Sequence, residues 1–182
     1  MLCIIYSFYS IRHGRTPTSH HQGWNQLKDI AFVVCDTLFG DVLSSPVIKK
    51  IVDEALNFDI PLRHIGNNKY VLELFHGPTL SFKDIGARFM ARSTAVRWNA
   101  FATAPPLSPL VAKMTLRRPL LPGSSVYFFH AYARAMEQHD GDAEVVISVP
   151  CGNLGSLAAA LMAKKMGLPV KRFIAANNAN DV

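Results

Sequence analysis

The sequence predicts an α/β fold whose C-terminal part is a βαβ unit, and three observations support this prediction. Residues Glu144–Val149 read EVVISV, a β-branched run typical of a buried strand. A glycine-bearing loop over Pro150–Ser156 follows, and the alanine- and leucine-rich text of Leu157–Met166 indicates a helix. A second β-prone run, Val170–Ala176, completes the unit, so parallel strands joined by a right-handed crossover are expected.

Two helices and a pair of strands are predicted in the first half of the chain. Residues 26–39 place apolar side chains on one helical face, and Pro46 suits the first position of a second helix. The apolar stripe of that second helix consists of Ile48, Ile51, Val52, Ala55 and Leu56. Residues 61–65 and 70–75 indicate strands around Gly66-Asn67-Asn68, residue types that tolerate positive φ. Residues 1–25 have little pattern and predict no element.

The second of these strands leads into Leu74–Ala91, LFHGPTLSFKDIGARFMA, which mixes turn residues, hydroxyls and one lysine. His76-Gly77-Pro78 predicts a turn. The hydroxyls of Thr79 and Ser81 could cap a helix that begins near Phe82.

This arrangement places Lys83 in the first turn of the predicted helix, where Ile85, Phe89 and Met90 would face the core and Arg88 would face outward. The positive end of the helix dipole disfavours a lysine there. A solvated lysine that tolerates the position is the commoner explanation. The alternative is a lysine held unprotonated by burial for use as a nucleophile.

Residues 92–125 differ in style from the rest, because they carry five prolines and no clear helical or strand period. We expect irregular structure there, with one short helix around residues 110–116, before a helix over Tyr127–Glu137. The chain therefore divides into four regions. These are an N-terminal region (1–25), the lysine-bearing region (26–92), a proline-rich interruption (93–125) and the βαβ region (126–182).

The glycine loop of the βαβ region has the features of an anion site. Backbone N–H groups converge where a strand leads into a helix N-terminus, and the helix dipole favours negative charge. Gly152 and Gly155 leave room for close approach, and Asn153 and Ser156 could add donors. An ordinary βα turn is the alternative. Cys151 could be a thiolate activated by the helix N-terminus, but a small residue at the loop entrance is the better explanation.

The net charge of +6 raises nucleic acid as a partner, but the charge distribution argues against it. No acidic residue lies between Asp84 and Glu137, so the excess belongs to one segment, and stacking aromatics are not interleaved with its basic residues. We therefore expect no nucleic-acid partner. The basic residues of that segment are Arg88, Arg92, Arg97, Lys113, Arg117, Arg118 and Arg134.

The remaining composition predicts a cytoplasmic protein without a metal site. Hydrophobic residues make up 49% of the 182 residues, enough for a real core, yet no run is long enough to span a membrane. Three widely spaced cysteines, Cys3, Cys35 and Cys151, fit no metal-ligand pattern and suggest a reducing compartment, with Cys35 a core residue. His20-His21 has no third ligand at usable spacing.

Two segments carry a resemblance to a known family. Glu73–Thr79 followed by Ser81–Asp84, ELFHGPT and SFKD, resembles the lysine segment of threonine synthases. VISVPCGNLG with AKKMGLPVKRFIAANN resembles the family segment whose glycine loop holds the phosphate of pyridoxal 5′-phosphate (PLP). The resemblance implies a partial, internally interrupted form of the PLP fold-type-II (tryptophan synthase β-like) architecture. YFFHAYARAME, at the start of the βαβ region, is similar to an aromatic-rich helix of the family.

The resemblance also implies a function and its residues. Lys83 would attach covalently to PLP and act as acid and base on the substrate. Gly152, Asn153, Leu154, Gly155 and Ser156 would hold the cofactor phosphate. The reaction would convert O-phosphohomoserine and water to threonine and phosphate. No match to the family's T-S-G-D-T-G substrate loop occurs in this chain, which favours a shortened form of the full enzyme.

Three other interpretations remain open at this point. The chain could be a non-catalytic remnant, or a small phosphate- or nucleotide-binding βαβ module supported by the glycine loop alone. It could also be a PLP enzyme with another substrate, as in related dehydratases, although the HGPT and SFKD segments favour the synthase.

Overall fold

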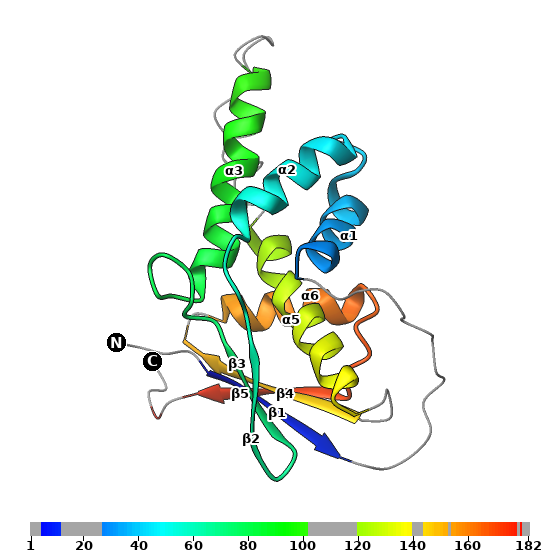
Figure 1. Cartoon of the computed structure of the whole chain (residues 1–182), viewed down its shortest axis with the longest axis vertical. Helices are drawn as coiled ribbons and strands as arrows, with labels where there is room; N and C mark the ends of the chain where they lie inside the picture. Colours follow the sequence, from blue (N-terminus) through cyan, green and yellow to red (C-terminus); the bar gives the residue numbers. More distant parts are fainter. Residues whose placement is uncertain are drawn as a thin grey trace.

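The computed structural model describes residues 5–11, 27–101, 120–139, 144–152, 154–177 and 179. Within these residues a five-stranded sheet lies below a layer of helices (Figure 1). The strands, in their order across the sheet, are β2 (Leu62–Gly66), β3 (Lys69–Glu73), β1 (Ile5–Ile11), β4 (Glu144–Cys151) and β5 (Arg172–Asn177). The helices are α1 (Leu27–Phe39), α2 (Ser45–Ala55), α3 (Lys83–Phe101), α5 (Leu120–Glu137) and α6 (Gly155–Lys165).

Strand β1 lies in the middle of the sheet and connects its two halves. It pairs antiparallel with β3 on one side and with β4 on the other, so Ser7 lies opposite both Val71 and Ser148. The prediction of no element in residues 1–25 is therefore wrong for 5–11, while 12–25 lie outside the described residues. A strand draws its stability from its neighbours in the sheet, and the seven residues of β1 carry no local turn signal to mark them.

Apart from α3 and α5, the other elements of the lysine-bearing and βαβ regions confirm the sequence-based predictions, with ends shifted by at most three residues. In α2, Ile48, Ile51, Val52 and Ala55 are buried as the predicted stripe requires. The turn between β2 and β3 uses positive φ at three consecutive residues, Gly66 (95°), Asn67 (50°) and Asn68 (54°). Strands β4 and β5 pair in parallel across α6, as a βαβ unit requires.

The predicted irregular structure over 93–125 is wrong at both ends of that range. Helix α3 continues to Phe101, and α5 begins at Leu120, seven residues before the predicted start. Pro122 lies in the first turn of α5, where a missing N–H does not cost a helical hydrogen bond. A Cβ on Gly123 would come within 3.0 Å of the Phe89 side chain, so this glycine lets α5 approach α3 closely. The short helix predicted around 110–116 lies outside the described residues.

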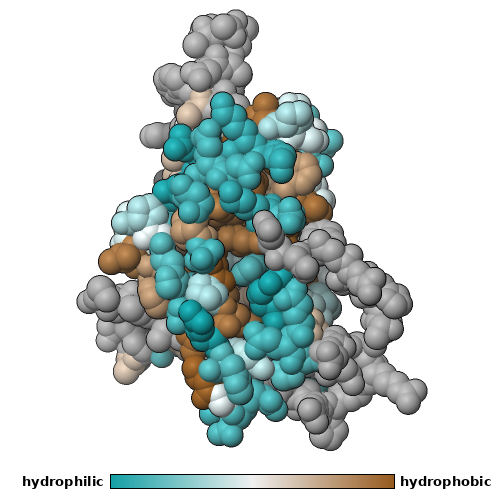
Figure 2. Space-filling model, viewed as in Figure 1, coloured by the Kyte–Doolittle hydropathy of each residue, from teal (hydrophilic) through white to brown (hydrophobic). Residues whose placement is uncertain are grey.

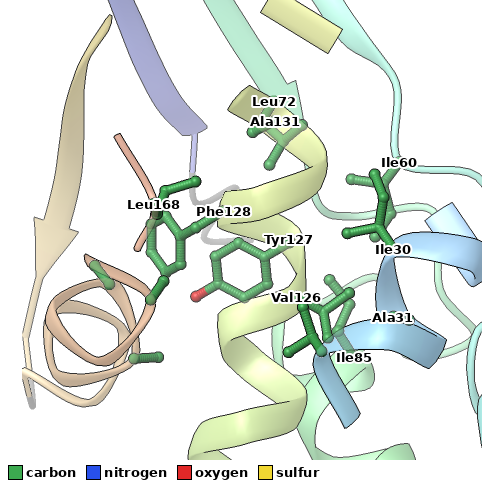
Figure 3. Close-up of a cluster of buried hydrophobic side chains, with 14 of the residues drawn as sticks. Ile30, Ala31, Ile60, Leu72, Ile85, Val126, Tyr127, Phe128, Ala131 and Leu168 are labelled. Atoms are coloured by element: carbon green, nitrogen blue, oxygen red, sulfur yellow. The ribbon is translucent and has the colours of Figure 1, made fainter. Parts of the chain in front are cut away.

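The core fills the space between the helices and the sheet, and α5 runs through its centre (Figure 3). Tyr127 and Phe128, both almost fully buried, point from α5 toward α6, and Val126 lies on the side of α1 and α3. The Phe128 ring meets Phe173 of β5 edge-on at a centroid distance of 5.8 Å. These contacts join the helix layer to the βαβ unit.

Small side chains allow α6 to pack closely against α5 and the sheet. Ala159, Ala160 and Ala163 are all fully buried. Cys35 is likewise fully buried in α1, which confirms its prediction as a core residue. On the face shown in Figure 2, hydrophilic residues cover most of the coloured surface, with hydrophobic residues in strips between them.

Candidate functional site

The lysine segment (Glu73–Asp84) and the glycine loop both follow the C-terminal end of a strand, and these two strand ends lie on the same side of the sheet. Strands β3 and β4 both run antiparallel to β1, so they run parallel to each other. Val71 and Ser148 lie opposite the same residue of β1. From there β3 reaches its C-terminal end two residues further on, at Glu73, and β4 three residues further on, at Cys151. Two strand spacings separate β3 from β4, about 10 Å. Residues from the two segments can therefore face one ligand at the C-terminal ends of β3 and β4.

After β3, a tight turn leads directly into the helix that carries Lys83. The Leu80 N–H donates to the Gly77 carbonyl over 3.0 Å, which closes a turn with Pro78 in its favoured second position. Ser81 Oγ accepts a hydrogen bond from the Lys83 N–H over 3.3 Å, as the capping prediction expects. The capping role predicted for Thr79 is wrong, because its hydroxyl donates instead to Asp84 Oδ1 over 2.7 Å.

Lys83 is the first residue of α3 and its side chain is exposed. The burial expected for a nucleophilic lysine is therefore not observed. The next residue along the helix, Asp84, occupies the inward direction and is only 4% exposed. Ile85 and Phe89 face the core as predicted, and Met90 is half-buried.

Arg88, predicted to face outward, instead binds the C-terminal end of α2. Its Nε donates to the Ala55 carbonyl over 2.9 Å, and Nη2 donates to the Glu54 carbonyl over 2.9 Å and to Asn57 Oδ1 over 2.7 Å. The prediction is wrong because a guanidinium can satisfy the unpaired carbonyls at a helix end. Arg88 thus holds α3, and with it Lys83, against α2.

The glycine loop is the second segment of the candidate site. Helix α6 begins at Gly155, two residues before the predicted start, so Gly155 and Ser156 lie in its first turn. A Cβ placed on Gly152 or on Gly155 would have no atom of the described residues within 4 Å, so within this part of the chain both glycines border open space. Leu154 is exposed and adopts a left-handed conformation with φ of 55°. Asn153 lies outside the described residues.

Cys151 lies at the loop entrance and does not have the properties of an activated thiolate. Burial raises the pKa of the Cys151 thiol, and a backbone hydrogen bond at Ala176 opposes this with a smaller effect. Its Sγ donates to the Val149 carbonyl over 3.2 Å. The geometry favours the small-residue interpretation of this position.

Sequence reasoning missed two polar groupings near the lysine segment. Asp84 accepts two hydrogen bonds from Thr79, and only its location in a first helical turn could have indicated such a role. Glu73 pairs with His76 over 2.8 Å and with Arg63 over 3.8 Å at the end of β3. The first grouping ties the Thr79 backbone to α3, and the second joins side chains around the end of β3.

Two histidines of the βαβ region, His130 and His139, have structural contacts. His130 Nε2 bonds the Ile60 carbonyl over 2.8 Å, and His139 Nε2 bonds the Tyr70 hydroxyl over 2.7 Å. In the part of the chain that the structure describes, no three His, Cys, Asp or Glu side chains gather as a metal site would require. None of the described helices is both long and apolar enough to cross a membrane.

Known proteins are similar to this chain in both sequence and fold. The threonine synthase of Haemophilus influenzae is 29% identical over 236 aligned residues, which cover 86% of this chain and 55% of the relative. That of Escherichia coli is 28% identical over 222 residues, covering 81% and 51%. The crystal structure of the Escherichia coli enzyme superposes with a TM-score of 0.68 at 26% identity, over 85% of this chain and 53% of that one. The chain is homologous to the threonine synthases.

Other comparisons bear on the fold and on the extent of the match. A PLP-bound threonine synthase from Brucella melitensis shares the fold, with a TM-score of 0.65 at 22% identity. No family model matches the chain. The mixed α/β fold thus corresponds to half of the threonine synthase structures, the PLP fold-type-II architecture.

The chain spans about half the length of the threonine synthases it matches. Moreover, the 236 aligned residues outnumber the 182 residues of this chain. The Haemophilus influenzae enzyme therefore contains residues inside the matched region that have no counterpart here. That these belong at the interruption over 93–125 remains a prediction.

Proposed function

We propose that this chain binds PLP between Lys83 and the glycine loop of residues 152–156, and that the site serves the threonine synthase reaction. In that reaction O-phosphohomoserine and water give threonine and phosphate. The observation that carries the proposal is the direction of β3 and β4. Both run antiparallel to β1, so the segments that follow them begin on the same side of the sheet. Homology to the threonine synthases supports the choice of cofactor and substrate.

The residues at the glycine loop fit the phosphate of PLP. The open space at Gly152 and Gly155 is where a side chain would otherwise block the approach of an anion. The first-turn N–H groups of α6, at Gly155 and Ser156, have no carbonyl partner within the helix and are oriented to donate. Ser156 could add its hydroxyl. Asn153 and Leu154 are proposed members of the same cradle.

Lys83 fits the covalent attachment point, because its side chain is exposed and follows closely on the C-terminal end of β3. When bound, PLP would supply an electron sink for the chemistry on the substrate carbons. Lys83 would hold the cofactor and move protons to and from those carbons. The backbone N–H groups of the loop would hold the phosphate.

A second candidate function is a PLP-binding remnant without turnover. Two observations favour it. The chain spans about half the length of its relatives, and Lys83 is exposed rather than enclosed. An enclosed site excludes water and strengthens the electrostatic interactions on which catalysis depends. Binding and turnover therefore need separate measurements.

The binding test adds PLP to the purified chain, reduces the mixture with borohydride and maps the modified lysine by mass spectrometry. We expect modification at Lys83 and its loss in Lys83→Ala. Lys49→Ala, at an exposed position on α2, is the matched control and should behave as the wild type. Equal modification of Lys49 and Lys83 in the wild type would overturn the proposal of a PLP site.

The turnover test measures phosphate release and threonine formation from O-phosphohomoserine in the PLP-loaded protein. Release of phosphate with threonine, dependent on Lys83, supports the synthase. PLP binding without release indicates the remnant. Conversion of threonine or serine to an oxo acid instead would indicate a dehydratase and overturn the proposed substrate.

A further inference from the structure

The buried carboxylate of Asp84 holds the turn that precedes Lys83. Asp84 accepts two hydrogen bonds from one residue, with the Thr79 N–H donating to Oδ2 over 2.8 Å and the Thr79 hydroxyl donating to Oδ1 over 2.7 Å. Both carboxylate oxygens are therefore engaged, although the side chain is only 4% exposed. A buried carboxylate needs such partners, and its place in the first turn of α3 adds the favourable helix dipole.

The backbone at Gly77 packs against the same carboxylate. A Cβ at this position would lie 2.4 Å from Asp84 Oδ2 and 2.7 Å from Asp84 Cβ. Any residue larger than glycine would therefore displace the carboxylate or the turn. Gly77, Thr79 and Asp84 form one structural unit, which we call the Asp84 clamp.

The clamp holds a strained turn between its ends. Leu80, between Thr79 and Asp84, adopts a left-handed conformation with φ of 57° and is exposed. This conformation is unfavourable for leucine and persists only where surrounding contacts fix it. Its N–H bonds the Gly77 carbonyl, so the strained residue lies inside the clamp.

Lys83 is adjacent to the anchored residue but is not part of the anchor. Its side chain is exposed, and among the residues that the structure describes the Lys83 ammonium has no ion-pair partner. Successive residues on a helix point in different directions. Anchoring Asp84 inward therefore fixes the backbone at Lys83 while its amine points outward.

We propose that Asp84 is a positioning residue, which through its clamp on Thr79 and Gly77 fixes where Lys83 leaves α3 toward the cofactor. The proposal rests on the proposed role of Lys83 in PLP binding. It assigns the threonine of the HGPT segment to the support of the lysine. Thr79 then contributes to binding only through Asp84.

The test compares Thr79→Val, which loses the hydroxyl donor but keeps the size of the side chain, with Thr79→Ser, which keeps the donor. The first readout is amide hydrogen exchange over residues 77–84 without any ligand. We expect exchange to become about fivefold faster in Thr79→Val, and Thr79→Ser to restore protection. Unchanged exchange in Thr79→Val would overturn the clamp whether or not the chain binds PLP.

The second readout is PLP modification of Lys83 after borohydride reduction, scored against Lys49 in the same sample. We expect the Lys83 signal to fall about fivefold in Thr79→Val and to recover in Thr79→Ser, while Lys49 stays constant. Thr37→Val is the matched control, since the Thr37 hydroxyl bonds the Val33 carbonyl within α1.

The outcomes distinguish the two proposals. Faster exchange with undiminished Lys83 modification overturns the positioning role but leaves the PLP site intact. A wild type without selective modification overturns the proposed function, and the exchange readout still decides whether the clamp exists. Asp84→Asn, which keeps one acceptor oxygen, should lie between the wild type and Thr79→Val in both readouts.

Discussion

At the residue scale, a buried titratable side chain makes the stability of the fold depend on pH. His130 is 6% exposed, with Nε2 on the Ile60 carbonyl and Nδ1 without a hydrogen-bond partner among the described residues. Burial lowers the pKa of His130, the Ile60 hydrogen bond opposes this, and the Arg134 charge lowers it further. The folded state therefore resists protonation of this ring more than the unfolded chain does.

We expect this histidine to make the protein less stable in mild acid. Below the unfolded pKa of about 6.5, the unfolded chain binds a proton that the folded chain does not, so stability falls with pH down to the folded pKa. Urea unfolding at pH 7.5 and pH 5.5 measures the effect. His130→Gln should show a smaller loss between these pH values, and an equal loss in both proteins would contradict the assignment.

The two described cysteines should differ in reactivity. Burial raises the pKa of Cys35 to about 12, so its thiol should resist alkylation until the protein unfolds. Cys151 is partly exposed beside the glycine loop and should react faster, and PLP should slow that reaction if the loop holds its phosphate. Peptide mapping after timed alkylation measures both rates. Equal rates for the two cysteines in the native protein would contradict the burial of Cys35.

At the scale of elements, helix ends carry both the site and the contacts that hold it. The N-terminus of α6 supplies the proposed phosphate cradle, and the C-terminus of α2 is capped by Arg88 of α3. We therefore expect different effects of substitution at the two ends. The N–H groups at the start of α6 are proposed to bind a ligand, whereas the carbonyls at the end of α2 already accept hydrogen bonds from Arg88.

Gly155→Ala should separate stability from binding. Alanine favours helix over glycine by up to about 1 kcal/mol, and the new Cβ meets open space, so the free energy of unfolding should rise or stay constant. The same methyl group would occupy space proposed for the phosphate, so PLP affinity should fall. Thermal unfolding and PLP titration of the variant measure the two effects. Unaltered affinity would show that the phosphate does not bind here.

Arg88→Ala should lower the free energy of unfolding by about 1–3 kcal/mol, because three acceptors at the end of α2 lose their donor. Arg92→Ala is the matched control on the same helix. It removes only an exposed ion pair with Glu54, which contributes about 0–1 kcal/mol. Urea unfolding of both variants provides the comparison, and a larger loss in Arg92→Ala would contradict the capping role.

Sequence pattern predicted the elements whose signal is local and missed those that depend on distant partners. Helix α2 and the βαβ unit carry periodic apolar residues and turn glycines, so their local sequence is enough to predict them. The prolines after α3 suggested irregular structure, but the extension of α5 to Leu120 is possible because Pro122 lies in its first turn. Likewise, Lys83 and the loop could be selected from sequence, whereas the Thr79–Asp84 hydrogen bonds depend on how the turn closes.

At the scale of the whole molecule, one strand makes the sheet continuous. Strand β1 separates β3 from β4 and pairs with both, so the β2–β3 hairpin and the β4–β5 pair share one sheet only through it. The relative placement of the lysine segment and the glycine loop depends on this strand.

Ser7→Pro tests this dependence. Proline removes a ladder hydrogen bond and fits poorly in a central strand, so we expect the free energy of unfolding to fall by about 3 kcal/mol or more. PLP modification of Lys83 should fall with it. Ser7→Thr, which suits a strand, is the control, and wild-type stability in Ser7→Pro would show that β1 does not join the two halves.

The same central strand has a consequence for the order of folding. Ser7 pairs with Val71 and with Ser148, contacts that span much of the chain, whereas β2–β3 and β4–α6–β5 form between neighbours in sequence. Contacts between distant residues form slowly because a long loop must close first. We therefore expect the two local units to form early and independently. The chain then joins them in a late step, when its first strand enters between two preformed edges.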